Sequence, residues 1–297
     1  MALRLDRLIT LHLVSPLQRL SLRAKPAIPI LMYHSVADHD ESRTRPYYRT
    51  ATSPAVFAAQ MEQLHSHGYR TCTVAQVRTL LESDPAIAAR TVAITFDDGY
   101  RDFYLNAFPV LHKYGFTATM FLPTAFIGDT MLQFKGRDCM TWSEVRELQQ
   151  CGVLFGSHTM THPQLRDLDS ASVEREITNS KSSIEQKTGS AVSTFAYPYA
   201  FPQRDAEFKK RLRVSLSRAG YLSGVCTTLG RATSHSDQFF MERLPVNSLD
   251  DSALFHAKLS GAYDWMAKPQ SAVKAGKAWV RAVVRRDPVI GGTGEQV

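Results

Sequence analysis

Short apolar runs alternate with helical patterns along most of this 297-residue chain. Runs with the character of buried strands lie at 28–36, 91–96, 117–122, 153–162, 192–200 and 221–228. Helical patterns separate them, and the clearest lie at 54–68, 140–152, 170–189 and 205–220. Strand followed by helix, repeated, favours parallel strands joined by crossover helices. We therefore predict an α/β fold, specifically a (β/α) barrel.

Polar residues collect where the predicted strands end. His34 ends the first run, Asp97 and Asp98 follow "TVAITF", and His158 and His162 follow "VLFGS". "YPY" at 197–199 ends a further strand. In parallel barrels the reactive side chains gather at the carboxyl ends of the strands. The sequence therefore predicts a single site formed by residues that are far apart in the chain.

Two imidazoles and two carboxylates at these strand ends indicate a metal site. His158 and His162 are four residues apart, so one helical turn would place both on one face. Imidazole nitrogens suit Zn, Co, Ni or Fe, and one carboxylate would complete a set that leaves positions open for water and substrate. The other carboxylate could then act as general base on that water. The residues alone do not say which Asp has which role, and a structural Asp-Asp-Gly turn ending at Gly99 is the alternative.

The order of motifs is similar to that of a known family. "TFDDG" (95–99), "SHTMTHPQL" (157–165) and "FAYPY" (195–199) resemble the polysaccharide deacetylase family, the NodB-homology enzymes of carbohydrate esterase family 4. "LMYHSV" (31–36) and "MTWSEVREL" (140–148) look like members that act on bacterial exopolysaccharide. The resemblance runs from about residue 28 to about residue 246.

The resemblance implies a distorted (β/α) barrel of the NodB-homology type and a metal-dependent hydrolase of N-acetyl groups. It implies that Asp97 is the general base and that Asp98, His158 and His162 hold a divalent ion, Zn in the first place, with Co or Ni as alternatives. The main-chain N–H of Tyr199 would stabilise the oxyanion. The implied partner is an N-acetylated glycan in bacterial polysaccharide synthesis or modification.

Two parts of the family pattern are missing from this sequence. The family usually has Arg-x-Pro-Tyr, with the Arg bonded to the catalytic Asp, but Ala196 stands at the Arg position. We expect Arg243 in "MERLPV" to supply the guanidinium. The usual late Leu-x-His, which carries the general acid, is not evident either. His34 is the expected acid or pocket residue, and His235 is a poorer candidate.

Positive charge is concentrated at both ends of the chain. The net charge is +7, and residues 1–25 hold five basic residues against one acidic, while 258–297 hold seven against three. The nearly neutral middle argues against a nucleic-acid groove. Basic ends favour an anionic surface, so we expect peripheral membrane contact through the termini.

The expected domain organisation has three parts. Residues 1–27 form a basic amphipathic segment, 28–250 the deacetylase domain, and 251–297 a basic helical extension in which 272–286 suits an amphipathic helix. Both terminal helices could equally pack on the domain's own surface. No signal peptide is evident, so the expected location is cytoplasmic, at the inner membrane face.

Two other functions fit the same residues. One is an amidohydrolase of the same barrel type acting on a non-sugar C–N bond, such as a cyclic imide or ureide. The other is a catalytically weak sugar-binding homologue. The four residues Asp97, Asp98, His158 and His162 argue against the second, because a binding module needs no metal-ligand set.

Overall fold

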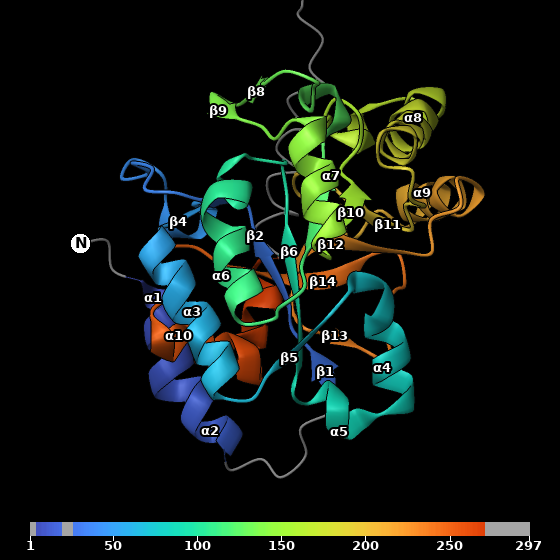
Figure 1. The fold of residues 1–297 in the computed structure, drawn as a ribbon. Coiled ribbons are helices and arrows are strands. Elements are labelled where there is room, and N and C mark those ends of the chain that lie inside the picture. The colour runs from blue at the N-terminus through green and yellow to red at the C-terminus, as the bar shows by residue number, and fades with distance from the viewer. Residues whose placement is uncertain (1–3, 20–25, 271–297) are drawn as a thin grey trace, which may run out of the picture.

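A closed barrel of seven parallel strands forms the centre of the protein. The computed structural model describes residues 4–19 and 26–270 (Figure 1). The barrel strands follow one another around the ring in chain order, each pairing with the next and the last with the first. They are β2 (Ile30–Tyr33), β6 (Thr91–Phe96), β7 (Thr119–Leu122), β10 (Leu154–Ser157), β11 (Thr194–Ala196), β12 (Ser223–Leu229) and β14 (Met241–Pro245). The predicted (β/α) barrel is confirmed.

Helices surround the barrel (Figure 1). They are α3 (Pro54–Ser66), α4 (Val77–Ser83), α5 (Pro85–Ala88), α6 (Phe108–Lys113), α7 (Trp142–Gln150), α8 (Ser170–Thr188) and α9 (Ala206–Arg218). A further strand, β5 (Arg70–Cys72), pairs with the first half of β6 outside the ring. Three small pairs complete the sheets: β1 (Ala27–Ile28) with β13 (Ala232–Thr233), β3 (Ser35–Val36) with β4 (Ala51–Thr52), and β8 (Gln133–Phe134) with β9 (Arg137–Asp138).

Local sequence explains where several elements begin and end. All six residues of β6 are buried, as a β-branched run in a parallel sheet requires. Helix α7 begins at a capping box, in which the Thr141 hydroxyl accepts from the Glu144 N–H and the Glu144 carboxylate accepts from the Thr141 N–H. Helix α8 ends at Gly189, whose φ of 70° suits a left-handed C-cap.

Two predicted elements differ in detail from the observed ones. The run at 28–36 is not one strand, because β2 ends at Tyr33 and β3 resumes at Ser35, which leaves His34 at the break. The helix predicted from Phe103 opens with a π-helical turn, Phe103–Ala107, before α6. Pro109 lies in the first turn of α6 and has no N–H to donate, which disfavours regular α-helical bonding just before it.

Helical segments from both ends of the chain pack together on one side of the barrel. The N-terminal segment comprises α1 (Leu5–Ile9), the π-helical turn η1 (Thr10–Val14) and α2 (Ser15–Arg19). It contacts α10 (Ser252–Ser260), which also packs against α3. The amphipathic helix expected at 272–286 lies outside the described residues.

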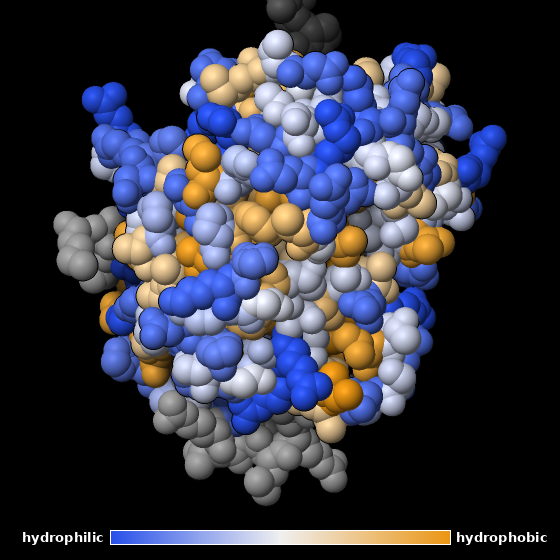
Figure 2. Space-filling view, viewed as in Figure 1, coloured by the Kyte–Doolittle hydropathy of each residue, from blue (hydrophilic) through white to orange (hydrophobic). Residues whose placement is uncertain are grey.

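The face drawn in Figure 2 is mainly hydrophilic, with hydrophobic residues scattered among the polar ones. Apolar side chains from the strands and the surrounding helices fill the interior. Among residues 4–19 and 26–270, no helix combines the length and the apolar character needed to cross a bilayer.

Candidate active site

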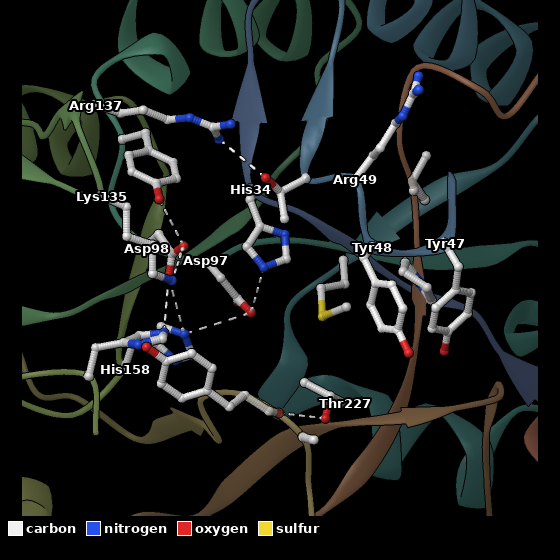
Figure 3. Close-up of a pocket in the computed structure, with 18 of the residues that line it drawn as sticks. His34, Tyr47, Tyr48, Arg49, Asp97, Asp98, Lys135, Arg137, His158 and Thr227 are labelled. Atoms are coloured by element: carbon white, nitrogen blue, oxygen red, sulfur yellow. Dashed lines mark hydrogen bonds and ion pairs between the residues drawn. The ribbon is translucent and has the colours of Figure 1, made fainter. Parts of the chain in front are cut away.

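An open pocket of about 410 Å³ lies at the carboxyl ends of the barrel strands. The residues that line it lie in or just after the ends of the strands, from Met32 in β2 and His34 after it round to Val246 after β14. Figure 3 shows Asp98 and His158 on one side of this pocket and Tyr47 and Tyr48 on the other. The prediction that polar strand ends converge on one site therefore agrees with where these side chains lie.

Three of the predicted residues form a compact cluster. Ligand-type atoms of Asp98, His158 and His162 all lie within 4.8 Å of one another, and all three residues are buried. Asp98 Oδ1 lies 3.5 Å from His158 Nε2 and 3.2 Å from His162 Nε2. Asp98 follows β6, and both histidines follow β10; these two strands lie on either side of β7.

His158 is held in one orientation by its second ring nitrogen. Its Nδ1 donates to the Ala196 carbonyl of β11 at 2.9 Å, so Nε2 is the nitrogen that faces Asp98. Burial lowers the pKa of His158 to about 4. The imidazole is therefore neutral at physiological pH, with the Nε2 lone pair directed into the cluster, which is the form that binds metal ions.

Asp98 is oriented by contacts on its other oxygen. The Tyr100 hydroxyl donates to Oδ2 at 3.1 Å, and the Lys135 ammonium lies 3.5 Å from the same atom. Although burial alone would raise it, the contacts with His162 and the nearby positive charges hold the pKa of Asp98 well below its usual range. The carboxylate is therefore ionised.

The cluster fits a divalent ion. Asp98 Oδ1 is buried and accepts no hydrogen bond from the described residues, although two imidazole nitrogens lie close to it. An unsatisfied buried carboxylate oxygen is costly, and a shared cation would satisfy it together with both nitrogens. Two imidazoles and one carboxylate form a donor set suited to Zn and similar ions.

Asp97 forms a buried, bidentate ion pair with Arg243. Asp97 Oδ1 and Oδ2 accept from Arg243 Nη1 and Nη2 at 2.7 and 2.8 Å. The arginine is fully buried, and it also donates to the Cys226 carbonyl and the Thr95 hydroxyl. Burial opposes ionisation of Asp97, but the guanidinium outweighs it and keeps the pKa of Asp97 below its usual value.

His34 lies beside Asp97 at the break between β2 and β3. Its Nε2 is 4.0 Å from Asp97 Oδ2, and its side chain is 21% exposed (Figure 3). Burial lowers the pKa of His34. His235 is exposed in the turn after β13 and is not among the pocket residues.

Tyr199 also lies in the pocket, after β11. Its φ is 57°, and its ring packs edge-on against the His162 ring with centroids 4.5 Å apart. The Tyr199 carbonyl accepts from the Thr227 hydroxyl at 2.7 Å, which fixes the turn.

Backbone strain is concentrated at this site. In the described chain, five residues other than glycine have positive φ: Asp98, Lys135, Thr159, His162 and Tyr199. Four of them line the pocket, and the Thr159 hydroxyl accepts from the His162 N–H at 3.0 Å. Such conformations cost energy and persist where surrounding contacts enforce them. The unusual backbone conformations of these residues are therefore enforced by contacts in and around the pocket.

Glu176 of α8 holds the segment between the two histidines. Its buried carboxylate accepts from the N–H groups of Met160 and Thr161, both at 2.8 Å, and from the Thr161 hydroxyl at 2.6 Å. Glu176 could not be predicted from the sequence, because nothing in α8 marks one glutamate as buried. Thr159 bonds within the loop, whereas Thr161 bonds to the helix.

The opposite wall of the pocket includes residues that sequence motifs did not reveal. Tyr47 and Tyr48 lie in a short 3₁₀ turn, Pro46–Tyr48, and their rings meet edge to face. Gln270, beyond α10, donates to the Tyr47 hydroxyl and to the Thr227 carbonyl. Tyr100 and Lys135 could have been suspected from their places beside Gly99 and in a Lys-Gly turn, but Gln270 has no local signal.

Comparisons with other proteins agree with this geometry. Residues 85–221 match the family model for polysaccharide deacetylase. YxkH of Bacillus subtilis (strain 168), whose assigned name is that of a polysaccharide deacetylase, is 30% identical over 224 residues, which are 75% of this chain and 73% of that protein. The poly-beta-1,6-N-acetyl-D-glucosamine N-deacetylase of Staphylococcus aureus (strain N315) is 25% identical over 216 residues, 69% of this chain and 70% of its own.

A solved structure supports the fold independently. The deacetylase PplD of Streptococcus pyogenes, in complex with acetate, superimposes with a TM-score of 0.68 at 24% identity. The match covers 80% of this chain and 99% of that one. The fold match and the cluster of Asp98, His158 and His162 agree with the 30% identity to YxkH. The chain therefore belongs to the polysaccharide deacetylase family of hydrolases.

Proposed function

We propose that this protein is a metal-dependent deacetylase that removes N-acetyl groups from N-acetylhexosamine units of a bacterial polysaccharide or glycan precursor. The observation that carries the proposal is the buried cluster of Asp98, His158 and His162 with the Arg243-bound Asp97 next to it, at the base of an open pocket. The named activity of the Staphylococcus aureus relative supports the substrate class.

The ion would be held by Asp98 and by the Nε2 atoms of His158 and His162. Zn is the first choice, with Co or Ni as alternatives, because neutral imidazole suits all three. When bound, such an ion lowers the pKa of a water molecule and polarises an amide carbonyl.

Asp97 is proposed as the general base. Its carboxylate is ionised and fixed by Arg243, so Oδ2 can take a proton from the attacking water. Its distance of 3.9 Å from His158 Nε2 places that oxygen at the edge of the cluster. A new C–O bond forms at the acetamide carbon, and the C–N bond breaks to give acetate and an amine.

His34 and Tyr199 are proposed to serve the two ends of the breaking amide. His34 Nε2, 4.0 Å from Asp97, can deliver a proton to the leaving nitrogen. The Tyr199 main-chain N–H can donate to the developing oxyanion, and the left-handed turn at Tyr199 sets the direction of that amide. Tyr47 and Tyr48 offer ring faces on which a sugar can lie.

The test combines metal content with product release. We expect purified protein to bind one divalent ion and to release acetate from N-acetylglucosamine oligomers. Asp97→Asn should keep the ion but lose activity about 10²–10⁴-fold, while His162→Ala should lose the ion. Release of product from cyclic imides or ureides in place of acetate would favour the amidohydrolase alternative. Sugar binding without an ion or turnover would favour the binding homologue.

A further inference from the structure

Tyr47 is held at both ends on the pocket wall that lies across from the candidate metal ligands (Figure 3). Its backbone lies in the turn Pro46–Tyr48, and the carbonyl of Pro46 accepts from the side-chain amide of the buried Asn247 at 3.0 Å. At the other end of the side chain, the Tyr47 hydroxyl accepts from Gln270 Nε2. Both the base and the tip of this tyrosine are therefore fixed.

The side-chain amide of Gln270 has only one favourable orientation. Its Oε1 accepts from the Leu229 N–H at 2.9 Å, and its Nε2 donates to the Thr227 carbonyl at 3.2 Å. A main-chain N–H can only donate and a carbonyl can only accept, so a flipped amide would lose both bonds. The NH2 group is therefore the donor to the Tyr47 hydroxyl, and the hydroxyl oxygen is the acceptor in this contact.

The hydrogen of the Tyr47 hydroxyl is left for a molecule in the pocket. A phenol oxygen that accepts one hydrogen bond still has its own O–H to donate, and within residues 4–19 and 26–270 the Tyr47 O–H donates to no protein group. Burial raises the pKa of Tyr47 well above its ordinary value of 10.0, so the hydroxyl stays protonated at neutral pH. This wall of the pocket therefore presents one uncharged donor whose oxygen has a fixed position.

We propose that Tyr47 binds substrate through this hydroxyl, which donates to a hydroxyl or ring oxygen of the glycan, and that Gln270 is the positioning residue that directs it. The inference rests on the proposed function, since a sugar offers both oxygen acceptors and an apolar face for the ring. A donor that is already fixed loses little side-chain freedom when substrate binds, which favours affinity.

The position of Tyr47 predicts which kinetic constant it affects. Tyr47 lies across the pocket from Asp98 and His158, where the amide would be cleaved (Figure 3). A hydrogen bond made away from the reacting atoms is equally strong in the bound substrate and in the transition state, so its loss raises KM and leaves kcat unchanged.

The test measures acetate release from N-acetylglucosamine oligomers together with the Kd of the same oligomers by calorimetry. Tyr47→Phe should raise KM and Kd about 2–12-fold, the effect of one lost hydrogen bond, with kcat within about twofold of the parent. Gln270→Met keeps the length of the side chain but forms none of its hydrogen bonds, so it should raise KM by a similar factor.

Two matched variants serve as controls outside the pocket. Tyr104→Phe removes a hydroxyl that donates to Glu147, and Gln18→Met removes an amide that donates to the Ser260 carbonyl. Both should keep the KM, Kd and kcat of the parent.

The double variant Tyr47→Phe/Gln270→Met tests whether the two residues act as a unit. Its KM should equal that of Tyr47→Phe alone within about twofold, because no hydroxyl is left for Gln270 to direct. Increases in KM that multiply in the double variant would overturn the assignment of Gln270 as the residue that positions Tyr47.

Two further results would overturn the proposal. One is a parental KM and Kd in Tyr47→Phe. The other is a fall in kcat without a change in KM in Gln270→Met, because Gln270 would then act through Thr227, whose hydroxyl holds the Tyr199 carbonyl. If Gln270→Met does not fold, Tyr47→Phe decides the matter, since it keeps the ring and leaves the Leu229 and Thr227 bonds of Gln270 in place.

Failure of this inference can be told apart from failure of the proposed function. A parent protein that binds the oligomers without releasing acetate would contradict the proposed function, and the Kd values would still test Tyr47. Acetate release by the parent with an unchanged Kd in Tyr47→Phe would contradict this inference alone. A parent protein that does not bind the oligomers would contradict both.

Discussion

Arg243 lies on β14, and its guanidinium reaches across the barrel interior to Asp97 at the end of β6. The family pattern would place an arginine on β11, where this chain has Ala196. A guanidinium can approach one carboxylate from more than one strand, because all the barrel strands point their carboxyl ends toward the same face. The ion pair that the family pattern implies is therefore present, and its guanidinium comes from another strand.

Arg243→Met should destabilise the protein by about 3–5 kcal/mol, because Asp97 would remain buried without its partner. Acetate release should fall at least about 100-fold. Arg243→Lys should be intermediate, since an ammonium cannot form the two-pronged contact. Urea unfolding and kcat would be measured for each variant.

The double variant Asp97→Asn/Arg243→Met serves as the control for this prediction. It should regain part of the lost stability without regaining activity, because neither buried charge is then left alone. Arg166→Met, on a surface pair in which the Arg166 side chain is 48% exposed, should change stability by less than about 1 kcal/mol. A fully stable and active Arg243→Met protein would contradict the assigned role.

At the scale of elements, the β8–β9 hairpin brings a lysine to the mouth of the site. Its two-residue turn consists of Lys135 and Gly136, with φ of 52° and 75°. A turn with positive φ at both positions favours Asn-Gly, so lysine is a poor choice for it. Lys135 nevertheless lies 3.5 Å from Asp98 Oδ2 and over the Phe134 ring. The contacts of the ammonium group account for a lysine at this strained position, whereas the turn itself does not favour one.

Lys135→Asn should therefore stabilise the hairpin by up to about 1 kcal/mol, since asparagine tolerates the left-handed conformation. The same change should lower acetate release several-fold, because a cation at the pocket mouth is lost. Lys135→Arg keeps the charge and is the matched comparison. Thermal unfolding and kcat/KM would be measured, and unchanged kinetics in Lys135→Asn would limit Lys135 to a structural part.

At the scale of the whole molecule, a partly buried polar network joins the N-terminal helical segment to α10 and the residues on either side of it. Asp6 accepts from Arg4 and from the Tyr263 hydroxyl, and Asp250 pairs with both Arg4 and the buried Lys258. Burial alone would raise the pKa of Asp6, but the Arg4 and Tyr263 contacts lower it below its ordinary value of 3.8. This network fastens the N-terminal helix to α10.

The lowered pKa of Asp6 fixes the sign of a pH effect. A depressed carboxyl pKa stabilises the fold above its unfolded value, and this contribution is lost as pH falls through the folded value. Asp6→Asn should therefore cost about 1–2 kcal/mol at pH 7, and the difference from the parent should shrink below pH 3.8.

Urea unfolding at pH 7 and pH 2.5, with hydrogen exchange at 5–18, would measure this effect. Asp129→Asn is the control, because that side chain is 73% exposed and pairs with Lys187 at the surface. Its effect should stay below about 1 kcal/mol. An Asp6→Asn penalty that does not change with pH would contradict the linkage.

The barrel and the residues of the cluster could be predicted from the amino-acid sequence alone. Strands appear as apolar runs because both faces of a parallel strand are buried, and helices are marked by caps such as Thr141 with Glu144. Asp97 and Asp98 follow one predicted strand, and His158 and His162 follow another, so each pair could be recognised from the local sequence. The local sequence could not predict that Asp98 Oδ1 and His162 Nε2 lie 3.2 Å apart.

Contacts between residues far apart in the chain became visible only in the folded molecule. Arg243 bonds to Asp97 across 146 positions, and Gln270 to Tyr47 across 223. Glu176 is one of several glutamates in a polar helix until the fold buries it against the loop at 160 and 161. Local patterns encode which residues are buried and where the backbone turns, but they do not contain the packing that chooses each side chain's partner, because those partners meet only after the barrel closes.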